Sequence, residues 1–313
     1  MYFPYVRGRQ YELLAIKELA MSERLSKHII PILEPVKLSS TLSKTMEEFV
    51  RKNRNLCVIC NPAVGSFNSD MKDDEKDINK QKFIELLSAP QIIKSHIIKK
   101  DSVSSLSSWE KNRGQKKTDW YVINTNRDYL SSYLELFEED APKMSFIPDE
   151  SAFRRKIRRN RSLLEDRFNK CNRNSDYANT PDEFFSDDHL FYKEDGFEGF
   201  SDYSVIGEDY LDSGFAPYAV AIHIVYFDDE RNLRVHHFVS DSNNDIQNPA
   251  GKFYEAVKKL DRWVKENNIT PTVSLQVFID HYNNQTYPGL GSVKKLSLMH
   301  HLELIGQYLD EVN

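Results

Sequence analysis

The sequence predicts an α/β protein whose mostly parallel sheet closes into a (β/α)8 barrel of the TIM type. Over the first two thirds of the chain, apolar runs rich in Ile and Val alternate with segments of helical spacing. Such runs lack a polar face, as expected of parallel strands covered by helices on both sides. A length of 313 residues suits one barrel. We therefore expect a single barrel domain over residues 1–313, with a doubly wound open sheet as the alternative.

Five apolar runs predict the first strands, and four segments with helical spacing are interleaved with them. The strands are expected at residues 29–36, 56–63, 92–99, 120–126 and 144–148, and the helices at 41–52, 78–87, 129–137 and 153–168. In the second of these helices, for example, Ile78, Phe83 and Leu87 recur at helical intervals. Strand and helix in alternation indicate βαβ units.

The pattern loosens after residue 185 but continues. We expect strands at residues 189–193, 203–206, 219–227 and 235–240, and helices at 250–265, 273–281 and 293–309. The polar segment 228–232 between the last two strands is typical of a hairpin loop, which makes that pair antiparallel.

Composition limits the classes of protein that the chain can belong to. The net charge is −6, with 40% hydrophobic and 29% charged residues, which disfavours a chain that coats nucleic acid with its whole surface. Cys57 and Cys60 lie in an apolar run where strand alternation points them to opposite faces, which disfavours a redox or zinc pair. With no signal peptide in the first residues and no apolar stretch of membrane length, we expect a cytoplasmic protein without membrane contact.

Polar residues follow several predicted strands, where barrels carry their chemistry. They form a candidate ring of ligand contacts: Glu34, Asn61, Lys99, Lys100, Asp101, Asn124, Asp149 and Glu150. The competing interpretation is that loops are polar because they are solvated and cap the next helix. Glu34 and Asp149 each follow an apolar run directly and are the strongest members. A hydrolase of the phosphodiesterase type would use these two carboxylates with His300 or His301.

Two glycine-containing segments precede late helices, at residues 248–253 and 288–295. A helix start offers unpaired N–H groups and the positive end of the helix dipole, and glycines let a phosphate approach the main chain. Ordinary turns are the competing interpretation, because neither segment matches a Walker A loop or a Rossmann fingerprint. The predicted anion site comprises Gly251, Lys252, Gly289, Gly291, Lys294 and Lys295, with Asp202 and Asp241 orienting the lysines or holding a metal.

Residues 154–161 carry six basic side chains among eight positions. On the predicted helix 153–168, Phe153, Ile157, Leu164 and Phe168 form an apolar stripe that leaves the basic residues facing outward. A nucleic acid or an acidic partner is a candidate ligand, and a solvated face is the competing interpretation. The predicted contacts are Arg154, Arg155, Arg158 and Arg159.

The histidines show no spacing typical of a metal site, and no nucleophile elbow or kinase signature is present. His236 and His237 are neighbours on a predicted strand and point to opposite faces, so they do not chelate one metal together. The sequence therefore names no metal and no cofactor.

Several segments resemble the phage beta-protein family and its bacterial relatives. The first is MYFPYVRGRQ at residues 1–10, followed by Glu12, and the others are IPILE at 30–34, EFFSD at 183–187, GFSDY at 199–203, HFVSD at 237–241, PAGKF at 249–253, YPGLG at 287–291, and KKLS at 294–297 with His300 and His301. The resemblance runs from residue 1 to about residue 310, and two of its segments coincide with the candidate anion site.

The resemblance implies a (β/α)-barrel protein found in phages and bacteria, often encoded beside a second small protein. It adds Arg7 and Arg9 near the barrel mouth, or bracing the first strand, as candidate ligand contacts, and it implies no catalytic residues. Our leading hypothesis is a barrel that binds a phosphate-bearing ligand, nucleotide or nucleic acid and acts with a partner from a neighbouring gene in anti-phage defence. The hydrolase described above and a structural adaptor without catalysis are the alternatives.

Overall fold

The computed structural model describes residues 1–72, 77–211 and 217–312. Its contacts group into two compact units. The barrel unit comprises Met1–Leu13, Lys27–Glu165 and Asp188–Asp202, and the second unit comprises Leu14–Ser26, Asp166–Asp187 and Tyr203–Asn313. Each unit has its own sheet, and we describe them separately.

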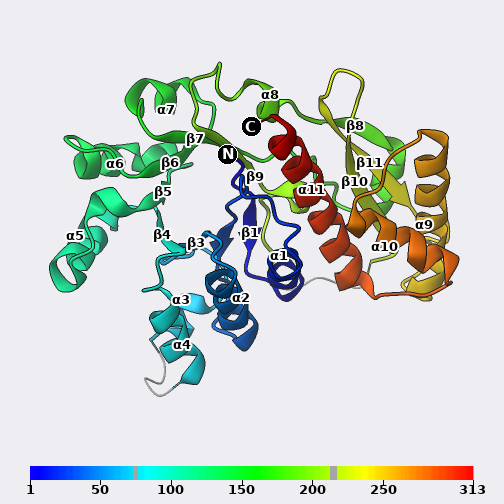
Figure 1. The fold of residues 1–313 in the computed structure, drawn as a ribbon, viewed down its shortest axis with the longest axis horizontal. Helices are drawn as coiled ribbons and strands as arrows, with labels where there is room; N and C mark the ends of the chain where they lie inside the picture. Colours follow the sequence, from blue (N-terminus) through cyan, green and yellow to red (C-terminus); the bar gives the residue numbers. More distant parts are fainter. Residues whose placement is uncertain (73–76, 212–216, 313) are drawn as a thin grey trace. The chain divides into compact units, whose positions relative to one another are not determined.

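The barrel unit contains a sheet of eight parallel strands among the described residues (Figure 1). In sheet order the strands are β1 (Tyr5–Arg7), β2 (Ile32–Glu34), β3 (Leu56–Ile59), β4 (Ile92–Ile97), β5 (Tyr121–Ile123), β6 (Met144–Ile147), β7 (Arg161–Glu165) and β9 (Gly199–Asp202). The backbone N–H of Phe3 donates to Phe200 O at 2.9 Å, and that of Phe200 donates to Met1 O at 3.1 Å. These bonds join the last strand to the segment that leads into the first, so the sheet is a nearly closed barrel and the fold prediction is confirmed.

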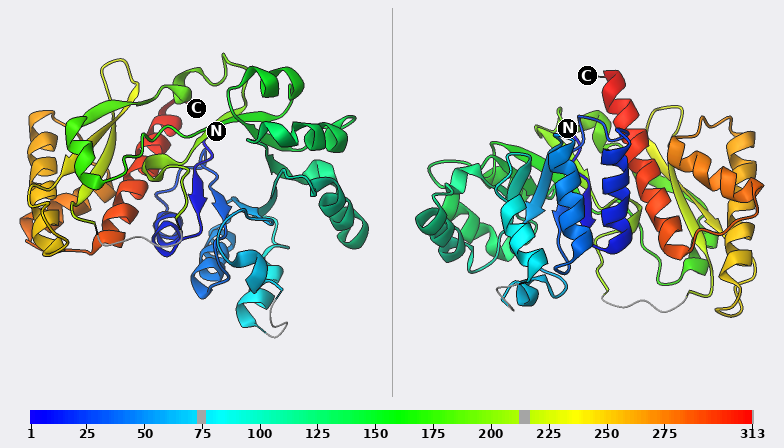
Figure 2. Two further views of the ribbon diagram at one scale, coloured as in Figure 1. Left: turned by 180° about the vertical axis from the view of Figure 1, so that it is seen from behind. Right: turned by 60° about the horizontal axis from the view of Figure 1, so that its bottom comes forward.

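Helices follow most of these strands, and two further views show the same alternation along the chain (Figure 2). They are α1 (Gln10–Met21, with the boundary between units after Leu13), α2 (Ser40–Arg51), α3 (Phe67–Asp70), α4 (Ile78–Leu86), α5 (Ser102–Arg113), α6 (Leu130–Phe137), α7 (Ser151–Lys156) and α8 (Asp188–Phe191), with 3-10 turns η1 (Lys117–Asp119) and η2 (Arg127–Tyr129).

Aromatic side chains fill the barrel interior. The ring of Phe3 lies 5.1 Å from that of Phe146 and 6.3 Å from that of Tyr121, measured between centroids. Phe3 precedes β1, whereas the other two rings come from β5 and β6, so they meet across the interior. Because side chains alternate along a strand, Tyr5 and Arg7 share the inward face with Phe3.

The second unit is built on a three-stranded antiparallel sheet. Its strands are β8 (Asp182–Ser186), β10 (Ala221–Phe227) and β11 (Leu233–Val239), with β11 in the middle, and the other elements are η3 (Asn174–Asn179), η4 (Ser204–Ile206), α9 (Pro249–Glu266), α10 (Val273–Asn283) and α11 (Leu290–Val312). Apolar residues of β10, α9, α10 and α11 form one buried cluster. The antiparallel hairpin and the three C-terminal helices predicted from the sequence are confirmed.

The structure corrects three local predictions. The helix expected over residues 153–168 is the short helix α7 followed by strand β7, because residues 162–164 are buried and pair with β6 and β9. The strand expected at 189–193 is helix α8, and the one at 203–206 is the 3-10 turn η4. Both short segments mix apolar residues with His, Tyr or Ser, so their periodicity is too brief to separate strand from helix.

No helix of the described residues is long and apolar enough to cross a lipid bilayer.

Candidate functional site

Glu34 is the centre of a polar network at the carboxyl ends of the first barrel strands. Its side chain is fully buried, and its Oε2 accepts hydrogen bonds from the hydroxyl of Tyr5 at 2.6 Å and from Nη1 of Arg7. Its Oε1 accepts from the backbone N–H of Ala63, in the loop after β3, at 2.7 Å. Arg7 is 11% exposed and lies 5.4 Å from the centre of the Tyr5 ring. The carboxylate therefore fixes an arginine and a loop at the barrel end.

Lys99 adds a second cation just beyond β4. Its Nζ donates to the backbone oxygens of Asn61 at 3.0 Å and Pro62 at 3.2 Å. Burial lowers the pKa of Lys99, and the carboxylates of Glu34 and Asp101 oppose that effect. An ammonium has three N–H donors, and the third has no partner among the described residues.

Asn61 and His96 hold the segment that carries Lys99. The side-chain Nδ2 of Asn61 donates a hydrogen bond to the backbone oxygen of Ile97, and its Oδ1 accepts one from the backbone N–H of Ile97, each at 2.8 Å. Nε2 of His96 lies 3.2 Å from Asn61 Nδ2 and 2.9 Å from Ser102 Oγ. Burial, followed by the charge of Lys99, lowers the pKa of His96 to about 4. The ring is therefore neutral at physiological pH and accepts hydrogen bonds at Nε2.

The other predicted strand-end residues lie outside these contacts. Asn124 is fully buried after β5, and its side-chain amide meets no partner in the described part of the chain. Asp149 is exposed and forms an ion pair with Arg154 at 2.7 Å. Asp202 is buried and accepts a hydrogen bond from the hydroxyl of Tyr2 at 2.7 Å.

Of the predicted strand-end and N-terminal residues, the structure brings together Arg7, Glu34, Asn61 and Lys99. We call these four residues the strand-end network.

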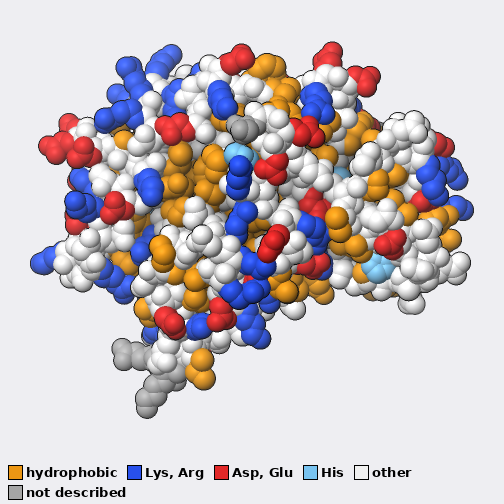
Figure 3. Space-filling view, viewed as in Figure 1, with side chains coloured by type: hydrophobic (Ala, Val, Ile, Leu, Met, Phe, Trp, Pro, Cys, Tyr) orange, Lys and Arg blue, Asp and Glu red, His pale blue; other side chains and the backbone are white. Residues whose placement is uncertain are grey.

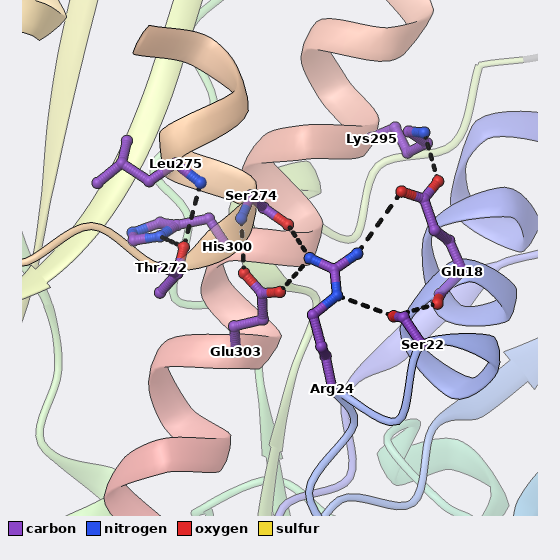
Figure 4. Close-up of polar contacts among 9 residues, drawn as sticks. All are labelled: Glu18, Ser22, Arg24, Thr272, Ser274, Leu275, Lys295, His300 and Glu303. Carbon is purple, nitrogen blue, oxygen red and sulfur yellow. Dashed lines mark hydrogen bonds and ion pairs between the residues drawn. The ribbon is translucent and has the colours of Figure 1, made fainter. Parts of the chain in front are cut away.

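Arg9 belongs to the barrel unit, whereas the predicted catalytic histidines belong to the second unit. Arg9 is half-buried just after β1. His300 and His301 are buried on α11 in the second unit. His300 bonds through Nδ1 to Thr272 Oγ1 at 2.8 Å (Figure 4). Its Nε2 bonds to Val225 O, also at 2.8 Å, so both its nitrogens have partners. Nδ1 of His301 bonds to Ser204 Oγ at 2.7 Å. These contacts suit packing, and the catalytic role of the two histidines stays a prediction.

The lysines of the predicted anion site have acidic or imidazole neighbours. Nζ of Lys295 lies 2.6 Å from Glu18 Oε2 (Figure 4). Lys252 is buried and donates to the backbone oxygen of Asp245, and Lys294 acts electrostatically on His223. Asp241 forms its ion pair with Lys259, at 2.7 Å, instead of with a predicted lysine.

The helix starts of this predicted site differ from each other. At the start of α9 the N–H of Gly251 is bound by Oδ1 of its N-cap residue Asn248 at 3.0 Å, so this donor is occupied. Gly289 precedes α11 with φ +85°, a conformation that favours glycine, and Gly291 lies in the first turn of that helix. The anion site at residues 251–295 stays a prediction.

The basic segment lines a second feature of the barrel unit. A cavity of about 500 Å³ lies between α6 and residues 156–159. Its lining includes the cations Lys156, Arg158 and Arg159, the carboxylates Glu135 and Glu138, and the apolar residues Tyr133, Leu134, Phe137, Ala141 and Ile157. The space-filling view shows Lys and Arg side chains gathered over the region of α7 (Figure 3). We call this feature the basic groove.

The predicted contacts of the basic segment divide into two groups. Arg154 is paired with Asp149, whereas Arg155, Arg158 and Arg159 are exposed and meet no carboxylate partner among the described residues. Arg158 and Arg159 donate only to backbone oxygens, of Arg155 and Glu139. Their charges are therefore available to a ligand.

Sequence reasoning did not single out two residues that contact the strand-end network, Tyr5 and His96. The hydroxyl of Tyr5 and the imidazole of His96 both have buried polar partners. The alternation of Phe3, Tyr5 and Arg7 was the available signal, because it predicts a strand with one face turned inward. Within the described residues, no group of three or more His, Cys, Asp or Glu side chains is arranged to hold a metal ion.

The fold and the strand-end network define a (β/α)8-barrel protein with a buried ion pair at its strand ends. No protein-family model, curated protein or solved structure matches the chain.

Proposed function

We propose that this protein binds a phosphate-bearing ligand at the strand-end network. The observation that carries the proposal is the half-buried ammonium of Lys99, with one donor left over, beside the Arg7–Glu34 ion pair. Two cations, Arg7 and Lys99, lie at the buried carboxylate of Glu34, and the only other carboxylate that acts on Lys99 among the described residues is the exposed Asp101. Barrel proteins place their ligands at this end of the strands.

The lowered pKa of Lys99 supports an anion in particular. Burial makes the charged ammonium costly, and the local carboxylates only partly offset that cost. A bound phosphate would supply the missing negative charge and hydrogen-bond acceptors. In this mechanism Arg7 and Lys99 contact the anion, while Glu34 holds Arg7 in position.

Titration calorimetry with inorganic phosphate, ATP and a short single-stranded DNA would test the proposal. Lys99→Met should weaken the binding of any phosphate-bearing probe by about ten- to a hundredfold, the effect of losing one charge-assisted contact. Lys82→Met is the matched control, because Lys82 forms an exposed ion pair with Glu47. Equal affinities of the wild type and Lys99→Met, or no binding of any probe by the wild type, would reject this site.

We infer nucleic-acid binding as a second candidate function, which the basic groove favours. Arg155→Glu, Arg158→Glu and Arg159→Glu together would reverse three exposed charges, and electrostatic binding depends steeply on such charges and on salt. The triple variant should lose binding to a single-stranded DNA or RNA in a filter assay. Retained binding would leave the groove as a solvated surface.

The biological role that we propose for this binding rests on the sequence resemblance. It supports a role in phage–host conflict together with a protein encoded by a neighbouring gene. Co-expression of the two genes with an affinity tag on this chain would test the partnership, and failure of the neighbouring product to co-purify would count against it.

A further inference from the structure

Asp182, at the start of β8 in the second unit, organises three side chains around one carboxylate. Its Oδ1 accepts from Arg234 Nε at 2.7 Å, and its Oδ2 lies 2.8 Å from the Tyr226 hydroxyl and 3.1 Å from His236 Nδ1. Burial raises the pKa of Asp182, but the hydrogen bonds from Tyr226, Arg234 and His236 outweigh it, so the pKa lies below its usual value. The carboxylate is therefore ionised at neutral pH.

This carboxylate sets the tautomer of His236. Burial lowers the pKa of His236 more than Asp182 raises it, so the ring is neutral near pH 7. A neutral ring beside a carboxylate carries its proton on Nδ1, which leaves Nε2 as an acceptor. No described residue provides a hydrogen-bond partner for Nε2.

His236 lines a cavity of about 250 Å³ between β11 and the last two turns of α9. The ring of Trp263 lies 5.2 Å from that of His236 with an interplanar angle of 33°, and the ring of Phe238 lies 4.4 Å away on the same strand. Arg262 is also in the lining and makes no hydrogen bond or ion pair with any described residue. The remaining charged groups of the lining are Lys259, which is paired with Asp241, and Glu266.

Packing of α9 on the sheet accounts for part of this arrangement. Phe238 belongs to the buried cluster of the second unit, and Trp263 packs against that cluster. Packing does not require that a carboxylate orient the imidazole of His236 and leave its Nε2 acceptor without a partner beside the cavity. Nor does packing require the unpaired guanidinium of Arg262 at the same cavity. These two features are typical of ligand sites, where a few placed polar groups accompany aromatic walls.

We propose that this cavity binds a nucleoside monophosphate or the terminal nucleotide of a nucleic acid. A nucleobase is planar and carries N–H groups at its edge, so it can stack on the ring of Trp263 while an edge N–H donates to His236 Nε2. The phosphate would then reach Arg262, whose planar guanidinium suits phosphate oxygens. The site belongs to the second unit and does not depend on the strand-end network.

Titration calorimetry of the full chain with AMP, GMP, CMP and UMP, and with inorganic phosphate, would test the proposal. At least one nucleotide should bind with a dissociation constant below about 1 mM, and His236→Gln and Arg262→Gln should each weaken it about tenfold or more. Trp263→Phe keeps a ring for packing, so it guards against misfolding while reducing the stacking area.

Two controls separate this site from the others. Lys258→Gln changes an exposed cation on α9 outside the cavity lining and should leave nucleotide affinity unchanged. In the Lys99→Met background, where binding at the strand-end network is weakened, His236→Gln and Arg262→Gln should still each weaken nucleotide binding about tenfold. The proposal is overturned if no nucleotide binds in this range, or if the cavity variants bind as their parent proteins do in both backgrounds.

Discussion

Arg7 and Glu34 form an ion pair directly across two neighbouring parallel strands. The two residues are register partners in β1 and β2, and both side chains are turned inward at the carboxyl end of the barrel. The backbone N–H of Gly8 also donates to Glu34 O at 2.6 Å. The pair therefore links the end of β1 to the end of β2 through both side chain and main chain.

Replacing Glu34 should destabilise the protein strongly. Glu34→Gln keeps the shape but removes the charge that compensates the nearly buried Arg7, and breaking a buried pair typically costs about 3–5 kcal/mol of unfolding free energy. Urea denaturation of the wild type and of Glu34→Gln would measure this loss of unfolding free energy. Glu47→Gln, the same change in the exposed pair with Lys82, should cost less than about 1 kcal/mol. Equal costs for the two variants would show that the Arg7–Glu34 pair contributes no more than a surface contact.

Gly65 and Gly114 offer a matched test of backbone fit. Both have positive φ, +73° and +64°, so alanine is strained at either position. A Cβ at Gly65 would lie 2.1 Å from Val36 O, whereas nothing lies within 4 Å of a Cβ at Gly114. Gly114→Ala should cost about 1 kcal/mol, and Gly65→Ala clearly more because the chain after β2 must move. Thermal melting of both variants would show whether the order holds.

The acidic partners of Arg24 should differ in their contributions. Arg24 lies between Glu303, which is 4% exposed and also accepts from the N–H of Ser274 at 2.9 Å, and Glu18, which is 45% exposed (Figure 4). Glu303→Gln should cost about 2–4 kcal/mol because it leaves a partly buried arginine without its closer carboxylate. Glu18→Gln should cost less than about 1 kcal/mol. A larger loss for Glu18→Gln in urea denaturation would contradict this account.

The barrel strands differ in how far the sequence predicts them. The runs around β2, β3, β5 and β6 are almost wholly apolar, so they stand out as buried parallel strands, whereas β4 also carries Lys94, Ser95 and His96. By contrast, β7 follows a basic segment whose apolar residues also recur at helical intervals, and β9 has only one large apolar residue, Phe200, among Gly199–Asp202. Those strands are specified by pairing with their neighbours, which no local pattern records.

The residues of the candidate strand-end site also differ in how far the sequence predicts them. Glu34 could be predicted because it comes directly after an apolar run, and the position of Lys99 after β4 placed it in the candidate ring. The link between Arg7 and Glu34 depends on the register of β1 against β2, which the short segment Tyr5–Arg7 does not reveal by itself. Two properties decide which polar residues of the candidate ring come into contact. They are the register of neighbouring strands and the alternation of side chains between the inward and outward faces of each strand.

His96 should make the stability of the protein depend on pH. Its pKa is about 4 in the folded protein, whereas an unfolded histidine titrates near 6.5. Between these values the unfolded state binds more protons, so the free energy of unfolding falls as the pH drops below about 6.5 and is unaffected above it. At pH 5 the contribution of His96 to this loss is about 2 kcal/mol.

His96→Gln isolates this contribution, because glutamine offers an acceptor to Asn61 and Ser102 but does not titrate. Other histidines with lowered pKa values, such as His223 and His300, are present in both proteins and cancel in the comparison. The wild type should lose about 2 kcal/mol more than the variant between pH 7 and pH 5, measured by urea denaturation at each pH. A stability difference between the two proteins that stays constant over this range would mean that His96 is not held neutral by its buried site.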